Sequence, residues 1–198
     1  MFFGKKKKTD RNAEKAQSKE MMQAKPLKKI NICILGEDGH GKTTLKNVIT
    51  ENGILGPDVP EYGMDSDIKK LRNAKDNAMQ IYEGLDNVER IDAAIYVIDV
   101  TQGPSSEFEK TIEAVYKLGS EDADIPVFVF LNKKDLVGDE DLIDFIEDEV
   151  RERLEQLLYI GLRFQIFRGS AKMAEEEGRE LLSPIIRLCD NLRNTVGN

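Results

Sequence analysis

A glycine-rich segment between a predicted strand and a predicted helix constrains the fold more than any other part of the chain. The segment GEDGHGKT, residues 36–43, fits the pattern G-x-x-x-x-G-K-S/T. It follows the apolar run INICIL and precedes residues 42–51, which have helical character. Glycines let successive backbone N–H groups turn toward phosphate oxygens, and the N-terminus of the following helix adds a favourable dipole. The segment therefore predicts a phosphate-binding loop.

Within this loop, Lys42 is predicted to reach the outer phosphates and Thr43 to offer its hydroxyl to Mg²⁺. His40 is the only histidine in the chain, and we interpret it as a residue that shapes the loop rather than as a general base. The predicted phosphate-binding residues form one continuous run: Gly36, Glu37, Asp38, Gly39, His40, Gly41, Lys42, Thr43 and Thr44.

A second motif, Asn132-Lys133-Lys134-Asp135, follows the apolar run PVFVFL some ninety residues after the loop. The Asp135 carboxylate can accept hydrogen bonds from guanine N1–H and the exocyclic amine, a donor pair that adenine lacks. Asn132 can bond the other edge of the base, and the stem of Lys133 can cover the ring. At the end of a strand and behind a phosphate loop, the motif predicts guanine binding.

A third loop, GSAK at residues 169–172, comes after the last predicted strand. Small residues at this place let backbone N–H groups approach the guanine oxygen. Ser170, Ala171 and Lys172 therefore complete the predicted guanine-binding residues, and the predicted ligands are GTP or GDP with Mg²⁺.

Strands alternate with helices along the chain, which predicts a parallel sheet covered on both faces. The predicted strands are residues 30–35, 93–100, 126–131 and 162–167, and the predicted helices are 42–51, 107–118, 140–158 and 179–193. Residues 53–63 are predicted to form a loop rich in glycine and proline. Apolar residues at helical spacing then predict one helix over residues 67–85.

Charge divides the chain into a basic extension, residues 1–28, and one domain, residues 29–198. Residues 1–29 carry a net charge of +7, whereas the whole chain of 198 residues carries −8. The acidic domain argues against specific nucleic-acid binding. Residues 1–8, MFFGKKKK, can make a weak contact with an anionic membrane, with a solvated tail as the alternative. The two cysteines, Cys33 and Cys189, lie inside apolar stretches and lack the spacing of metal ligands. We interpret them as reduced core thiols, which indicates a cytoplasmic protein.

The three motifs together resemble the GTP-binding domain of translational GTPases, most closely that of elongation factor Tu. The runs that carry the resemblance are GHGKTTL, IDAAIYVIDVTQGP, VFVFLNKKDLVGDEDL and FRGSAK. The resemblance implies an α/β fold of the P-loop NTPase type, a three-layer sandwich. It also implies nucleotide binding by Lys42, Thr43, Asn132, Lys133 and Asp135, together with Ser170 and Ala171.

The chain departs from this family between the first two motifs. Residues 51–100 contain no threonine and no aspartate with a glycine three positions later, so the switch threonine and the D-x-x-G sequence are missing. Counting back from residues 91–98 places D-x-x-G on residues 73–76 and the catalytic histidine of the family on Asn77. The interval is also too short for the usual strand pair. We therefore expect a reduced, mainly parallel sheet of about four strands, in which residues 30–35 form an exposed edge.

These departures predict guanine-nucleotide binding with weak or no hydrolysis and a regulatory or scaffolding role, and they leave the catalytic residues unknown. One alternative is an active GTPase with a rebuilt switch, in which Asp65, Asp67 or Asp76 supports Mg²⁺. Another is an interaction module without nucleotide. The β-barrel domains of the family are absent from these 198 residues. The expected partners are a protein of unknown identity and, through the exposed first strand, a second copy of the chain.

Overall fold

The computed structural model describes residues 28–51, 77–86, 88–118, 125–157, 163–176 and 183–196. Its centre is a parallel sheet of five strands in the order β2-β1-β3-β4-β5. The strands are β1 (Lys28–Leu35), β2 (Asn77–Glu83), β3 (Ala93–Asp99), β4 (Pro126–Asn132) and β5 (Arg163–Arg168). Every residue of β3 and β4 is buried, which explains their continuous apolar sequence.

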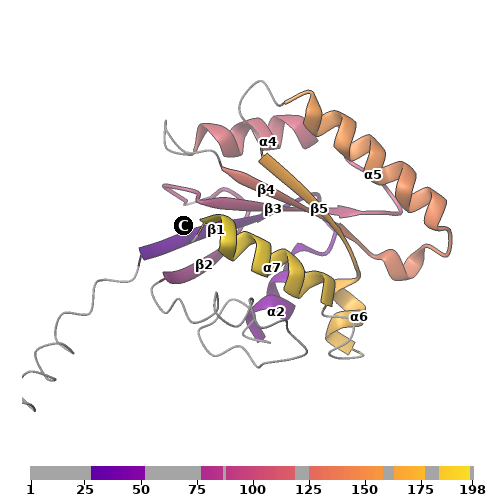
Figure 1. Ribbon diagram of the computed structural model, residues 1–198, viewed down its shortest axis with the longest axis horizontal. Coiled ribbons are helices and arrows are strands. Elements are labelled where there is room, and N and C mark those ends of the chain that lie inside the picture. The colour runs from indigo at the N-terminus through magenta and orange to yellow at the C-terminus, as the bar shows by residue number, and fades with distance from the viewer. Residues whose placement is uncertain are drawn as a thin grey trace, which may run out of the picture.

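Helices cover both faces of the sheet and make three layers (Figure 1). The helices α4 (Phe108–Lys117) and α5 (Glu140–Glu155) lie on one face. The other face carries α2 (Lys42–Glu51), α6 (Ala171–Glu176) and α7 (Ser183–Val196), and the single-turn helix η1 (Lys134–Leu136) follows β4. Each face has its own apolar core, and the two buried cysteines lie in different cores. The predicted α/β sandwich is therefore confirmed.

The prediction for residues 67–85 is wrong where the structure describes them, because residues 77–83 form β2 rather than a helix. β2 pairs in parallel with β1 along its whole length, from Lys28 opposite Asn77 to Ile34 opposite Glu83. The sheet thus has five strands instead of about four. β1 has a neighbour on each side, so it is not the exposed edge on which we expected a second copy of the chain to dock.

The helical prediction failed because both faces of β2 are covered. Ile81 packs against the core under α2 and α7, whereas the next residue, Tyr82, packs against the core under α4. Two adjacent apolar residues do not alternate as those of a half-buried strand would, and they happen to match a helical spacing. Pairing with β1 decides the outcome, because it satisfies the backbone groups of this segment along one side.

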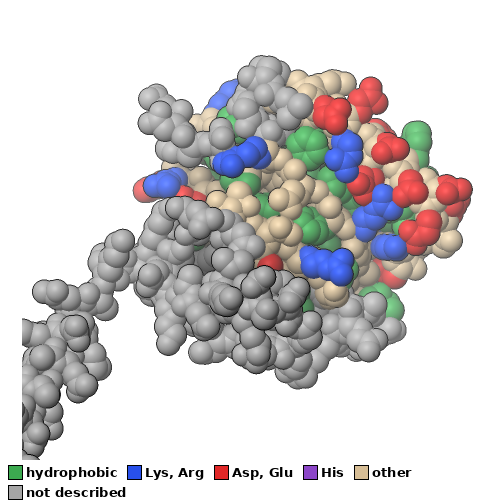
Figure 2. Space-filling model, viewed as in Figure 1, with side chains coloured by type: hydrophobic (Ala, Val, Ile, Leu, Met, Phe, Trp, Pro, Cys, Tyr) green, Lys and Arg blue, Asp and Glu red, His purple; other side chains and the backbone are tan. Residues whose placement is uncertain are grey.

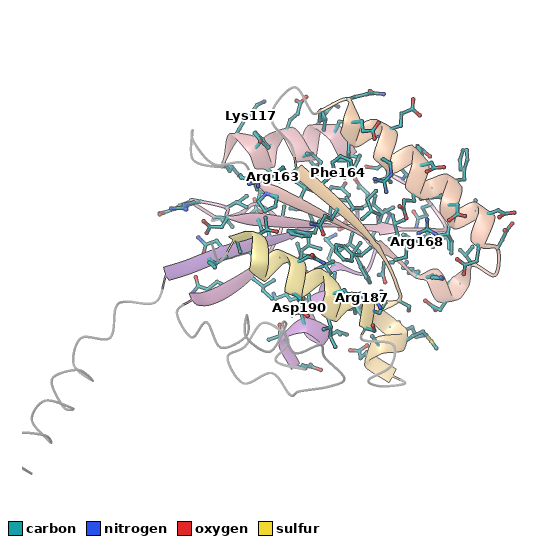
Figure 3. All side chains as sticks on the ribbon, in the orientation of Figure 1. Lys117, Arg163, Phe164, Arg168, Arg187 and Asp190 are labelled. Atoms are coloured by element: carbon teal, nitrogen blue, oxygen red, sulfur yellow. The ribbon has the colours of Figure 1, made fainter. Side chains whose placement is uncertain are left out.

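β5 is the edge strand on the opposite side of the sheet and is held to α5 by charge. Arg168 at the end of β5 forms ion pairs with Asp144 and Glu147 of α5 (Figure 3). Acidic side chains gather over α5 in the space-filling view (Figure 2). Within the described part of the chain, no helix is long and apolar enough to cross a membrane.

Candidate functional site

The predicted phosphate loop leaves the carboxyl end of β1 and runs into α2. Gly36, Gly39 and Gly41 all have positive φ, at 135°, 81° and 95°. A Cβ atom on Gly36 would lie 2.3 Å from the Val97 carbonyl oxygen, and one on Gly41 would lie 2.3 Å from Asn132 Nδ2. These positions require glycine because the loop curls tightly against β3 and β4.

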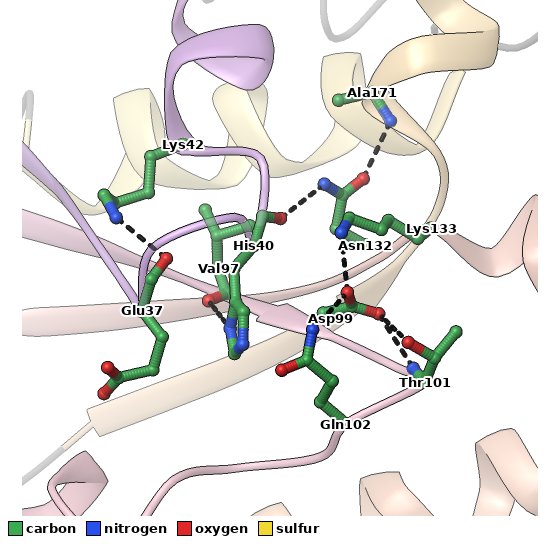
Figure 4. Close-up of polar contacts among 10 residues, drawn as sticks. All are labelled: Glu37, His40, Lys42, Val97, Asp99, Thr101, Gln102, Asn132, Lys133 and Ala171. Carbon is green, nitrogen blue, oxygen red and sulfur yellow. Dashed lines mark hydrogen bonds and ion pairs between the residues drawn. The ribbon is translucent and has the colours of Figure 1, made fainter.

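Lys42, at the first position of α2, holds its ammonium group over the loop. Its Nζ donates a hydrogen bond to the carbonyl oxygen of Gly36 at 2.9 Å. It also donates one to the carbonyl oxygen of Glu37 at 2.8 Å (Figure 4). The cation is thereby placed where the backbone N–H groups of a phosphate loop bring the anion. Thr43 and Thr44 follow in the first turn of the helix, and Thr43 is exposed.

His40 lies beneath the loop rather than in the solvent above it. It is 2% exposed, and its Nδ1 lies 3.3 Å from the carbonyl oxygen of Val97 in β3. A ring buried in this way supports the loop from below, in keeping with the predicted structural role.

Asn132, the last residue of β4, joins the phosphate loop to the loop after β5. Its Nδ2 donates to the His40 carbonyl oxygen at 2.8 Å, and its Oδ1 accepts a hydrogen bond from the Ala171 amide at 2.9 Å (Figure 4). The side chain is 3% exposed, so both bonds are sheltered from water. One buried amide therefore brings all three predicted motifs into a single site.

We call residues 132–135 and 169–172, which carry the motifs predicted to bind guanine, the base-side loops. These two loops are also tied together through their backbones. The Lys134 amide donates to the Gly169 carbonyl oxygen at 3.1 Å, and the Gly169 amide donates to that of Leu131 at 2.9 Å. Ser170 Oγ accepts a hydrogen bond from the Met173 amide in α6. Asp135 in η1 and Lys172 in α6 are exposed, so Asp135 is open to a ligand.

Asp99, at the end of β3, belongs to the site although no sequence motif points to it. Its Oδ2 lies 2.6 Å from Lys133 Nζ, and Thr101 and Gln102 donate further hydrogen bonds to its two oxygens (Figure 4). Burial raises the pKa of the Asp99 carboxyl, but these hydrogen bonds outweigh it and lower the pKa to about 2. The carboxylate fixes the ammonium end of Lys133, whose backbone φ is 63°.

Glu83, at the end of β2, is the second residue that sequence reasoning missed. Its Oε2 accepts a hydrogen bond from Thr43 Oγ1 at 2.8 Å, and its Oε1 lies 3.3 Å from Lys46 Nζ. The hydrogen bond from Thr43 and the nearby charges of Lys46 and Lys42 lower the pKa of Glu83. A carboxylate and a hydroxyl thus meet beside the phosphate loop. The sequence signal was the Glu-Gly pair that closes the apolar run before β3, not the expected D-x-x-G.

The connection from β2 to β3 crosses β1 in only nine residues, 84–92, although such crossovers usually take a dozen or more. Its described residues, 84–86 and 88–92, contain no helix. Asn31 of β1 holds the connection, because its amide donates to Asp92 Oδ2 and its Nδ2 donates to the Arg90 carbonyl oxygen. Val88 and Ile91 are buried in the core under α4. The segment after Glu83 is therefore short and anchored at several points.

The elongation factor Tu GTP binding domain is a family whose model matches this chain, over residues 79–191. The matched span covers more than half of the chain and runs from β2 into α7. It contains Glu83, Asp99, Asn132 and Ala171, while the phosphate loop lies before it.

Two solved structures of translation elongation factor SelB from Methanococcus maripaludis have a similar fold. The apo form matches with a TM-score of 0.60 and 21% identity, over 87% of this chain and 34% of SelB. The complex of SelB with the GTP analogue GPPNHP matches with a TM-score of 0.56 and 20% identity, over 87% of this chain and 35% of SelB. This chain therefore spans about a third of the length of SelB.

Proposed function

The chain belongs to the family of the elongation factor Tu GTP-binding domain, and from that premise we propose that it binds GDP and GTP with Mg²⁺ and hydrolyses GTP slowly. One observation carries the proposal. Asn132 bonds the His40 carbonyl and the Ala171 amide at once, so one buried side chain holds the phosphate loop and the loops after β4 and β5 in a single arrangement. Such preorganisation lowers the ordering cost of binding.

Guanine is the base that this site fits best. Asp135 is an exposed residue of η1, and the ammonium end of nearby Lys133 is held in place by Asp99. A carboxylate pairs with the two donors of guanine, whereas adenine would leave it without partners. Unpaired polar groups in a site built for hydrogen bonding give strong discrimination between ligands.

The residues around Thr43 fit Mg²⁺ bound together with nucleotide phosphates. Mg²⁺ is usually held by one or two protein oxygens, by water and by substrate phosphates rather than by an all-protein cage. Thr43 and Glu83 supply a hydroxyl and a carboxylate in contact with each other. In the residues that the structure describes, no group of three or more metal-binding side chains forms a separate cage. When bound, the ion would neutralise phosphate charge, and Glu83 would orient the Thr43 hydroxyl toward it.

Slow hydrolysis follows from what surrounds Lys42. Hydrolysis of GTP needs a group that positions the attacking water. The only histidine of the chain is buried under the loop, and among the described residues charged side chains lie near Lys42, those of Asp38, Lys46 and Glu83. The anchored connection after Glu83 also limits how far this segment can move toward a third phosphate.

A second candidate function, that of a working GTPase with a rebuilt switch, is favoured by the Glu83 contact. A carboxylate paired with the P-loop threonine restores one part that the absent D-x-x-G would have supplied. Asp65, Asp67 and Asp76, which we considered for this role from the sequence, lie outside the described residues. Single-turnover hydrolysis by the unaltered chain and by Lys42→Ala decides between the two functions, because rapid turnover that Lys42→Ala abolishes would favour the second.

The binding proposal is tested by titration calorimetry of the full chain with GDP and ADP, with and without Mg²⁺. We expect GDP to bind at least about 100-fold more tightly than ADP. Lys42→Ala should weaken GDP binding, whereas Lys117→Ala, an exposed lysine on α4, should not. Equal affinity for ADP and GDP would contradict the guanine-specific site, and no binding of either nucleotide would contradict the whole proposal.

A regulatory or scaffolding role, a protein partner and a cytoplasmic location stay predictions. So does a weak contact of residues 1–8 with an anionic membrane, because residues 1–27 lie outside the described part of the chain. Flotation of the full chain and of a chain lacking residues 1–8 with phosphatidylserine vesicles tests the membrane contact. Equal flotation of the two chains would argue against it.

A further inference from the structure

Two adjacent acidic residues of the phosphate loop, Glu37 and Asp38, place their carboxylates in different surroundings. Glu37 Oε1 accepts a hydrogen bond from Ser105 Oγ at 2.7 Å, which ties it to the loop before α4. The Asp38 carboxylate is fully exposed to solvent, and its Oδ1 lies 3.5 Å from Lys42 Nζ. Asp38 therefore faces the cation of the loop, whereas Glu37 is engaged elsewhere.

The Lys42 ammonium is shared among several acceptors within the loop. It donates to the carbonyl oxygens of Gly36 and Glu37 and also contacts Asp38. The lysine of such a loop bonds the outer phosphates of a nucleotide. The Asp38 carboxylate thus competes with those phosphates for the same cation and adds a negative charge beside them. On the β2 side, Glu83 is already paired with Lys46 and Thr43.

We propose that Asp38 is a specificity-determining residue that disfavours the third phosphate, so that the loop holds GDP in preference to GTP. The inference rests on the proposed guanine-nucleotide binding and adds a preference for the diphosphate over the triphosphate. GTP carries about one more negative charge than GDP, and that charge lies at the outer end of the phosphate chain, where Lys42 acts. Repulsion by Asp38 therefore raises the dissociation constant of GTP more than that of GDP.

The size of the effect follows from Coulomb's law. A unit charge that acts on the outer phosphate through water changes a dissociation constant by about fivefold. Because Asp38 is fully exposed, salt should screen its repulsion and reduce the preference at high ionic strength.

Asp38→Asn tests this inference in the full chain. The dissociation constants of GDP and of the imido analogue of GTP are measured with Mg²⁺ at low and high salt. We expect the unaltered protein to favour GDP by about fivefold at low salt and Asp38→Asn to reduce this ratio to near one. Because Asp38 is fully exposed, the variant should unfold at the same denaturant concentration as the unaltered protein.

Glu37→Gln is the matched control, because it removes the same charge from the adjacent residue of the same loop. Its carboxylate faces Ser105, so we expect any change in affinity to be shared equally by the two nucleotides. The inference is overturned if Asp38→Asn changes GDP and GTP binding by the same factor. It is also overturned if Glu37→Gln shifts their ratio as much. If the unaltered chain binds no GDP, the proposed function fails instead.

Discussion

The base side and the phosphate side of the nucleotide site hold their charged groups in different ways. On the base side, Asp99 is 2% exposed and fixes Lys133 through a 2.6 Å ion pair. On the side of β2, Glu83 holds Thr43 and Lys46 from the end of an edge strand, with 29% of its side chain exposed to solvent. The first arrangement is set by the core, whereas the second is open to water and ions.

This difference predicts which properties of the site are fixed and which depend on conditions. Buried pairs are screened little by salt, so the contact between Asp99 and Lys133 should be nearly independent of ionic strength. Exposed pairs contribute little by themselves and rearrange easily, so recognition of the outer phosphates should depend on Mg²⁺ and salt.

Asp135→Asn should have the largest effect, because it acts on the preorganised base side. Losing a carboxylate that accepts two hydrogen bonds costs about 3–6 kcal/mol, or at least about 100-fold in GDP affinity. The variant should bind xanthosine diphosphate instead, since the xanthine base presents an acceptor where guanine has its amine. Titration calorimetry with both nucleotides measures the change.

Asp148→Asn is the control for this experiment. It removes the same charge from the exposed face of α5, away from the motif. We expect its GDP affinity to match that of the unaltered chain. Unchanged GDP binding in Asp135→Asn would mean that the motif after β4 does not read the base.

Glu83→Gln should have a smaller effect, which is confined to the affinity for Mg²⁺. The amide oxygen of glutamine can still accept the Thr43 hydrogen bond, so the fold should be kept, but the negative charge is lost. Removing a group that orients a metal ligand typically weakens metal affinity by about 10- to 100-fold. The measurement is the Mg²⁺ concentration that half-saturates the slowing of GDP release.

Glu89→Gln provides the matched change, because Glu89 is an exposed residue of the connection after β2. Its Mg²⁺ dependence should equal that of the unaltered protein. If Glu83→Gln and Glu89→Gln behave alike, Glu83 does not serve the metal, and the phosphate side lacks the acid that we assign to it.

The sequence located the ends of β4 and β5 better than the end of β2, for a physical reason. Asn132 ends a fully buried apolar strand and Ala171 follows a partly buried one, so these strand ends could be located from apolar runs alone. Glu83 follows an edge strand whose residues Ile81 and Tyr82 face different cores, and this mixed pattern resembled a helix. Strand pairing with β1 is a long-range contact that no local pattern contains.

Asp99 was missed for another reason. It ends the apolar run of β3, where a single polar residue looks like an ordinary strand end. Its role depends on Lys133, 34 residues later, reaching back to it across the neighbouring strand. Counting from the family pattern also misplaced the missing D-x-x-G, because the connection between β2 and β3 takes only residues 84–92.

Acid should lower the free energy of unfolding by a measurable amount through Asp99. The pKa of this carboxyl is lowered from 3.8 to about 2 in the folded protein. The folded carboxyl therefore binds its proton more weakly than the unfolded one. Its stabilising effect is fully present above about pH 4 and is lost as the pH falls from about 4 to about 2. At 1.36 kcal/mol for each unit, the loss is about 2 kcal/mol.

Asp99→Asn should remove this part of the pH dependence. The free energy of unfolding is measured with urea between about pH 2 and pH 6 for both proteins. We expect the unaltered chain to lose about 2 kcal/mol more than the variant over the acid part of this range. Parallel curves for the two proteins would contradict the assignment of the low pKa to the buried pair.

The smallest effect should be the difference between GTP and GDP in the unaltered protein. A ligand shifts a conformational equilibrium only as far as its affinity for the two states differs. Here the segment after Glu83 is short, and Asn31 ties it to Arg90 and Asp92, so it offers few groups that can close on a third phosphate. We therefore expect the two dissociation constants to lie within about tenfold, or about 1.4 kcal/mol, at saturating Mg²⁺.

Asn31→Ala removes this anchor. The variant should change the ratio of the GTP and GDP dissociation constants only if the connection after Glu83 responds to the nucleotide. A ratio far above tenfold in the unaltered chain, with turnover that Lys42→Ala abolishes, would show that the phosphate side contains a working switch.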